Sequence, residues 1–223
     1  MFRGFPKGTV TFLAGLSKNN DKEWFEAHRA DYDACLVEPA KAFVEALGPA
    51  LEKVDAKVHA EPKVNGSIMR IHRDVRFARD KSPYKDHLDM WFWSGKKKGW
   101  ECSGFFFRLT PKTLLLGAGM HGFMPPVLAR YRRAVLDDAK GRALASVVAK
   151  LRKEGRDVGG ETYKKVPAGV PKDHPRAALL RHGGLYVGWE GKHPAELFTP
   201  KAVDFVVKEY GKLAPLHRWL TAM

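Results

Sequence analysis

The chain has 223 residues, 44% of them hydrophobic and 11% aromatic, which is enough for a folded core and excludes global disorder. A net charge of +14 either favours nucleic acid or other anionic partners, or serves solubility alone. No apolar run approaches the roughly 18 residues of a membrane span, no secretory signal is visible, and two cysteines exclude a disulfide scaffold. We therefore expect a cytoplasmic protein with no membrane segment.

The N-terminal part of the chain predicts two helices that each bury one face. In "NNDKEWFEAHRADY", Asn20 is the expected N-cap, and Glu23 completes a capping box three residues later. The next helix is expected to begin near Pro39. Its apolar residues from Phe43 to Val54 recur at intervals of three and four, which is the period of an amphipathic helix.

Strands are predicted next. Apolar and charged residues alternate over 67–77, which is typical of a strand. Further strands are predicted in "HLDMWFW", "WECSGFFFRL" and "TLLLGAG", with "SGKKKG" (94–99) as a turn. Connections this short leave no room for crossover helices, so we expect an antiparallel β-meander.

The helical period returns from Pro125 in "PPVLARYRRAVLDD" and "ALASVVAKLRKE", and a Gly/Pro-rich stretch at 158–175 precedes a short strand at "LYVGWE". In the last helix Thr199 is the expected cap, Pro200 the first helical residue, and Pro215 a kink or break. The predicted fold is a single α+β domain over 1–223, with an antiparallel β-meander sheet packed by N-terminal and C-terminal helices.

The segment "GAGMHG" at 117–122 matches the G-x-G-x-x-G pattern of dinucleotide-binding folds. That pattern needs a helix that opens at its last glycine within a βαβ unit, whereas here the helix is expected to begin only at Pro125 or Pro126. A glycine-rich strand exit, where a backbone can approach closely, is the favoured interpretation.

Other signals of chemistry are weak. No spacing of His, Cys, Asp or Glu predicts a metal site, and the sequence leaves any cofactor and the oligomeric state unknown. Two predicted helices carry basic residues that are either solvated faces or a phosphate-binding surface for nucleic acid. These residues are Arg130, Arg132, Arg133, Lys150, Arg152, Lys153 and Arg156.

The segment "RIHRDVRFARDKSPYKDH" at 70–87 contains six Lys or Arg residues and three Asp. In a strand, Arg73 lies on the face opposite Arg70 and Arg76, among apolar side chains. We therefore expect it to reach a carboxylate, with Asp74 or Asp80 as local partners, or a bound anion. Pro83 then restricts Ser82 to an extended conformation.

The surplus of cations predicts a site for a phosphate- or carboxylate-bearing ligand, because Arg donors fit such anions. Two interpretations stay open beside it: a nucleic-acid-binding protein that uses its distributed basic surface, and a non-catalytic interaction module whose charged segment is a structural ion-pair network. His72, His87 and His121 are weaker proton-transfer candidates. The predicted ligand-binding residues are Arg70, Arg73, Arg76 and Lys81, and the predicted catalytic residues, if there is turnover, are Asp74, Asp80 and Tyr84.

The same segment resembles the signature of a conserved-hypothetical family of bacteria and fungi, a domain of unknown function of about this length. The resemblance extends to "FLAGLSKNNDKEWFEAHRADY", "GAGMHGFMPPVLARYRRAV" and "VPAGVPKDHPRAALLRHGGLY", although "GMHGFMPP" is less acidic and aromatic than the family pattern. It implies no activity, cofactor or substrate. The residues that carry it are Arg70, Arg73, Asp74, Arg76, Phe77, Asp80, Lys81 and Tyr84.

Overall fold

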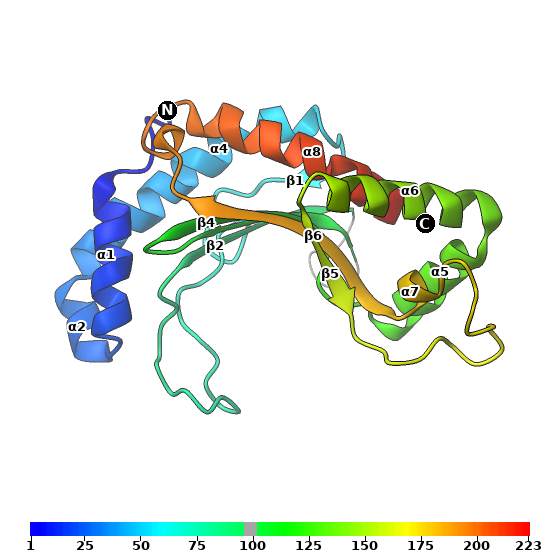
Figure 1. The fold of residues 1–223 in the computed structure, drawn as a ribbon. Coiled ribbons are helices and arrows are strands. Elements are labelled where there is room, and N and C mark those ends of the chain that lie inside the picture. The colour runs from blue at the N-terminus through cyan, green and yellow to red at the C-terminus, as the bar shows by residue number, and fades with distance from the viewer. Residues whose placement is uncertain (96–101) are drawn as a thin grey trace. The chain divides into compact units, whose positions relative to one another are not determined.

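The computed structural model describes residues 1–95 and 102–223 (Figure 1), so the predicted turn at 94–99 and the start of "WECSGFFFRL" lie partly outside the described residues. The fold is α+β, as the sequence predicts. Its six-stranded antiparallel sheet has the order β1-β2-β3-β4-β6-β5. No helix among the described residues is long and apolar enough to span a membrane. The strands are β1 Val58–His59, β2 Leu88–Ser94, β3 Gly104–Leu109, β4 Thr113–Met120, β5 Asp157–Glu161 and β6 His182–Lys192.

The chain divides into two compact units. The first comprises Met1–Phe92, Phe106–Leu116 and Glu190–Glu209, and the second comprises Trp93–Phe105, Gly117–Trp189 and Tyr210–Met223. The prediction of a single domain stays a prediction, and each unit is described by itself.

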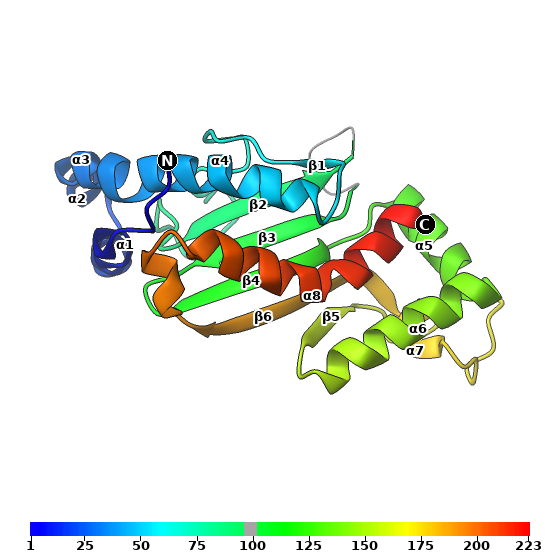
Figure 2. The same cartoon turned by 90° about the horizontal axis from the view of Figure 1, so that it is seen from above.

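The first unit contains the predicted N-terminal helices and the first turns of the C-terminal helix α8 (Ala202–Ala222). Figure 2 shows α4 (Glu38–Glu52) and α8 lying over the strands, and the buried aromatic side chains of these elements and of the N-terminus form the core. There the ring of Phe107 lies 5.9 Å from that of Phe5 and 5.4 Å from that of Phe43. The N-terminal elements are α1 Lys7–Lys18, α2 Lys22–Ala27, α3 Arg29–Tyr32, a π-helical turn at Asp33–Val37 and α4 Glu38–Glu52.

Helix α2 begins one residue later than predicted. Its N-cap is Asp21, whose carboxylate accepts a hydrogen bond from the Trp24 amide at 2.8 Å. The side chain of Asn20 is not available as a cap, because it binds the backbone of Tyr84 instead. By contrast, α4 begins at Glu38 with Pro39 in its first turn, as predicted.

The second unit contains α5 (Pro125–Leu136), α6 (Asp138–Lys153) and the short helix α7 (Ala177–Leu180), together with the last turns of α8. The buried hydroxyl of Tyr131 donates to the carbonyl of Leu179 at 2.9 Å, which ties α5 to α7. Pro215 does not break α8, which continues to Ala222. Strand β5, which the sequence analysis left in a loop, pairs antiparallel with β6.

Candidate functional site

The charged segment 70–87 is a loop of the first unit, not the strand predicted for 67–77. Only isolated bridges remain there: Ile68 bridges Val64 and Met90, and His72 bridges Tyr84. In Figure 1 the loop (teal) extends from the sheet on the side opposite α4. The amides of Met69 and Arg73 still bind the carbonyls of Asp89 and Pro83, but beyond Arg73 carboxylates of the loop bind the amides of Arg76 and Ser82.

Two aspartates of the loop bind backbone amides two residues further along. Asp74 Oδ1 accepts from the Arg76 amide at 3.3 Å, and Asp80 Oδ1 accepts from the Ser82 amide at 2.9 Å and the Ser82 hydroxyl at 2.6 Å. Such local bonds favour turns over a strand ladder. The alternation of apolar residues was therefore misleading.

Both aspartates also bind arginines. Arg73 Nη1 donates to the Asp80 carboxylate and to the carbonyl of Ser82, the latter at 3.0 Å. Asp80 was one of the two carboxylates that the sequence analysis proposed as partners of Arg73. Arg76 binds Asp74 with two donors, Nε at 2.9 Å and Nη2 at 2.7 Å. These pairs hold the shape of the loop and leave further N–H donors of both guanidinium groups unused.

The carboxylates of the loop are poor bases at neutral pH. Hydrogen bonds from the Ser82 hydroxyl and amide, and from Arg73, lower the pKa of Asp80 to about 2. Hydrogen bonds from the side chain and amide of Arg76 lower the pKa of Asp74. A general base works best when its pKa lies near the ambient pH. The catalytic role assigned to these aspartates stays a prediction that their environment does not favour.

The base of the loop is anchored to α2 through Tyr84. This side chain is only 4% exposed, and its ring stacks on that of Phe25 at 4.1 Å. Asn20 Nδ2 donates to the Tyr84 carbonyl at 2.9 Å, and the Tyr84 amide donates to Asn20 Oδ1 at 3.0 Å. Burial raises the pKa of the Tyr84 hydroxyl. Its predicted catalytic role stays a prediction, while its observed contacts are those of an anchor.

Replacing Asn20 by Ala should release this anchor. Two hydrogen bonds to partly buried backbone groups are lost, so we expect the free energy of unfolding to fall by about 1–2 kcal/mol. Amide hydrogen exchange should show faster exchange at Tyr84. Asn19→Ala is the matched control, because Asn19 binds only the Gly15 carbonyl, at the end of α1. Unchanged exchange at Tyr84 in Asn20→Ala would contradict the anchoring role.

Three cations of the loop are left over. Arg70, Arg79 and Lys81 are exposed, and no carboxylate within the described residues lies at ion-pair distance from any of them. The Lys81 ammonium donates to the Val75 carbonyl at 3.0 Å, and Arg70 acts on Asp74 only through its charge. These residues carry the positive surplus of the loop on its surface.

Phe77 lies between Arg70 and Arg79 in the sequence and is 95% exposed. The guanidinium carbon of Arg76 is 5.9 Å from the centre of its ring, and Asp74 holds that guanidinium in place. The sequence analysis placed Phe77 at the end of the strand predicted for 67–77, and the structure places it on the surface of a loop.

A second charged cluster, which the sequence analysis missed, is centred on Asp89 in β2. Asp89 is 4% exposed and binds Arg108 of β3 through Nε at 2.7 Å and Nη2 at 3.0 Å. His87 Nε2 lies 3.3 Å and Lys85 Nζ 3.6 Å from Asp89 Oδ2, while His87 Nδ1 lies 2.9 Å from Asp86. Since the Asp89 carboxylate already has several partners, we interpret the cluster as structural.

A signal for this cluster was present in the sequence. Asp89 interrupts "HLDMWFW" and Arg108 interrupts "FFFRL", and a charge in an apolar strand needs a partner. Burial raises the pKa of Asp89, but hydrogen bonds with His87 and Arg108 outweigh it and bring that pKa to about 2. A single acidic residue in one apolar strand and a single basic residue in the next strand of a meander thus predict an ion pair between the two strands.

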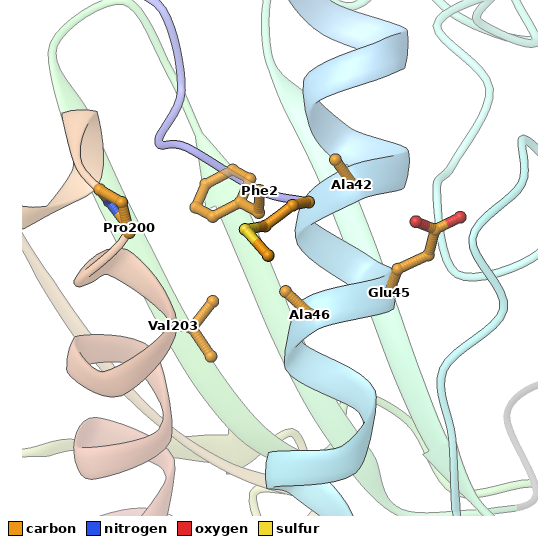
Figure 3. A pocket seen from close by; sticks show the side chains of 7 residues that line it. Phe2, Ala42, Glu45, Ala46, Pro200 and Val203 are labelled. Atoms are coloured by element: carbon orange, nitrogen blue, oxygen red, sulfur yellow. The ribbon is translucent and has the colours of Figure 1, made fainter.

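The first unit also has an apolar depression of about 460 Å³ between α4 and the start of α8 (Figure 3). Its labelled side chains are apolar except for Glu45, a carboxylate that repels anions. It therefore does not fit the predicted anionic ligand. The lining residues are Met1, Phe2, Ala42, Glu45, Ala46, Pro200 and Val203.

Within residues 1–95 and 102–223, no group of three His, Cys, Asp or Glu side chains is arranged to hold a metal ion. The family model described as "Conserved hypothetical protein (DUF2461)" matches residues 8–219 of the chain. A comparison with curated proteins found no match. The match covers both the charged loop and the Asp89 cluster, and its description names no activity.

Proposed function

We propose that this chain, which belongs to the DUF2461 family of conserved hypothetical proteins, binds a phosphate-bearing ligand on the loop of residues 70–87. The observation that carries the proposal is the exposed set of Arg70, Arg79 and Lys81, which no carboxylate of the described residues neutralises. Guanidinium groups offer forked donors to phosphate oxygens, and an ammonium adds a compact charge.

The paired residues of the loop support this role indirectly. Arg73 with Asp80 and Arg76 with Asp74 fix the backbone, so the loop presents its remaining cations without first having to become ordered. Arg73 and Arg76 stay predicted ligand-binding residues, since each guanidinium has further donors. The low pKa of Asp80 favours binding over proton transfer.

The test is the charge reversal Arg70→Glu/Arg79→Glu/Lys81→Glu, with inorganic polyphosphate as the probe. We expect the affinity measured by calorimetry at fixed salt to fall at least about tenfold, because three phosphate contacts become repulsive. Circular dichroism should show that the variant stays folded, because none of these side chains is buried.

The matched control reverses three exposed cations of the second unit, Arg130→Glu/Arg133→Glu/Lys153→Glu, with the same change in net charge. It should alter the affinity by no more than about threefold, through the change in net charge alone. An equal loss in both variants would favour the distributed basic surface instead. Absence of polyphosphate binding by the unmodified protein would overturn the proposal outright.

A further inference from the structure

We infer that the ligand of this loop is single-stranded nucleic acid, with the ring of Phe77 as a stacking surface for one base; this rests on the proposed function of the loop. All thirteen phenylalanines lie among the described residues; Phe77 is exposed, and the other twelve are buried or half-buried. Burying such a ring is worth about 2 kcal/mol, so a ring left in water is available to a partner.

The surroundings of Phe77 decide which partner fits. No other large apolar side chain between residues 70 and 87 is exposed, so the loop offers one ring rather than an apolar patch. A membrane or a protein partner would bury a larger apolar area than one ring provides. A base needs one aromatic face, and its phosphates need nearby cations.

The charge pattern agrees with this assignment. Arg79 and Lys81 follow Phe77 by two and four residues, so a nucleotide stacked on the ring has cations close by for its flanking phosphates. Arg76 is held by Asp74 at the edge of the site. The net charge of +14 favours the approach of any polyanion.

The strand must be single because the faces of bases in a duplex are already stacked on their neighbours. An aromatic side chain on a projecting loop reaches an unstacked base without deforming a helix. Stacking is largely independent of base identity, so we expect weak sequence preference and a strong dependence on salt.

The experiment compares three probes: a single-stranded oligothymidylate of roughly 12 nucleotides, an abasic sugar–phosphate oligomer of equal length, and inorganic polyphosphate. Phe77→Ala should weaken binding of the oligothymidylate by about 5- to 100-fold and leave the other two unchanged. Phe77→Trp should keep or improve the affinity. Tyr163→Ala is the matched control, because Tyr163 is an aromatic residue 42% exposed in the second unit, and it should change nothing.

The outcomes separate the inference from the proposed function. If polyphosphate binds but Phe77→Ala leaves oligothymidylate affinity unchanged, the stacking role is wrong and the phosphate site stands. If no probe binds, both are wrong. The inference would also be wrong if the protein bound duplex more tightly than single strand. The same holds if Phe77 mediated binding to vesicles of anionic phospholipid while the oligonucleotide did not bind. The charge-reversed loop should lower the salt slope for single strands by about 2, as expected for three lost phosphate contacts.

Discussion

Replacing Asp89 by Asn should lower the free energy of unfolding by about 3 kcal/mol, measured by chemical denaturation at neutral pH. The substitution keeps the shape of the side chain but removes a buried charge that Arg108, His87 and Lys85 surround. The cations are then left with an amide in place of a carboxylate. The loss of stability comes mainly from these cations, because their charges are partly buried and no longer have a carboxylate as a partner.

The matched control is Asp74→Asn, which removes the exposed ion pair with Arg76. Exposed pairs contribute little because water and salt screen them, so we expect no resolvable change in stability. If both variants lose the same amount, burial of Asp89 is not the reason for its contribution.

The Asp89 cluster should also make stability depend on pH. The pKa of Asp89 in the folded protein is about 2, below its usual 3.8, so its contribution is present above pH 3.8 and is lost as the pH falls through 2. The stability difference between the unmodified protein and Asp89→Asn should shrink by about 2 kcal/mol over that range. Other carboxylates titrate in both proteins and cancel in the difference. A difference that does not vary with pH would contradict the assignment.

Gly119→Ala should destabilise the protein by about 3 kcal/mol. Gly119 has φ +128°, which L side chains rarely adopt, and an added Cβ would lie 2.4 Å from the carbonyl oxygen of Leu185 and 2.6 Å from the Cα of Tyr186. Those atoms belong to the backbone of β6 and cannot move away without disturbing the strand. Thermal and chemical unfolding should both report the loss.

Gly122→Ala is the control from the same "GAGMHG" segment. An added Cβ there meets nothing within 4 Å and the backbone is unstrained, so we expect a change within about 0.5 kcal/mol. A dinucleotide site would need open space beside its first glycines for the pyrophosphate, whereas the β6 backbone lies next to Gly119. This agrees with the interpretation of the segment as a glycine-rich strand exit, as does the start of α5 at Pro125. Equal effects of the two substitutions would contradict this account of the segment.

The helices and the meander were predictable because their apolar residues repeat with the periods of elements that bury one face. Helix α4 and strands β2 and β4 lie where these patterns placed them. The strand at 67–77 was mispredicted because the hydrogen bond of Asp74 with the Arg76 amide competes with strand pairing, and no periodicity reports it.

Strand β5 was missed for a related reason. Its glycines have low strand propensity, yet Gly160 is required, because it has φ +106° and an added Cβ would lie 2.2 Å from the backbone carbonyl oxygen of Gly184. Likewise, the role of Asn20 depends on Tyr84, a partner 64 residues away. Such contacts join residues far apart in the sequence, and no local pattern of residues indicates the partner.

The attachment of Tyr84 to Asn20 and Phe25 has a consequence for folding kinetics. Asn20 and Tyr84 are 64 residues apart, so bringing them together has an entropic cost. Local ion pairs such as Arg73 with Asp80 are too weak to offset this cost. We therefore expect the loop to acquire its final shape only when α2 is already in place. During synthesis from the N-terminus, α2 precedes the loop, and its docking surface is made before the residues that use it. A circularly permuted chain that begins after α2 reverses this order and should fold more slowly at the loop while reaching the same native contacts.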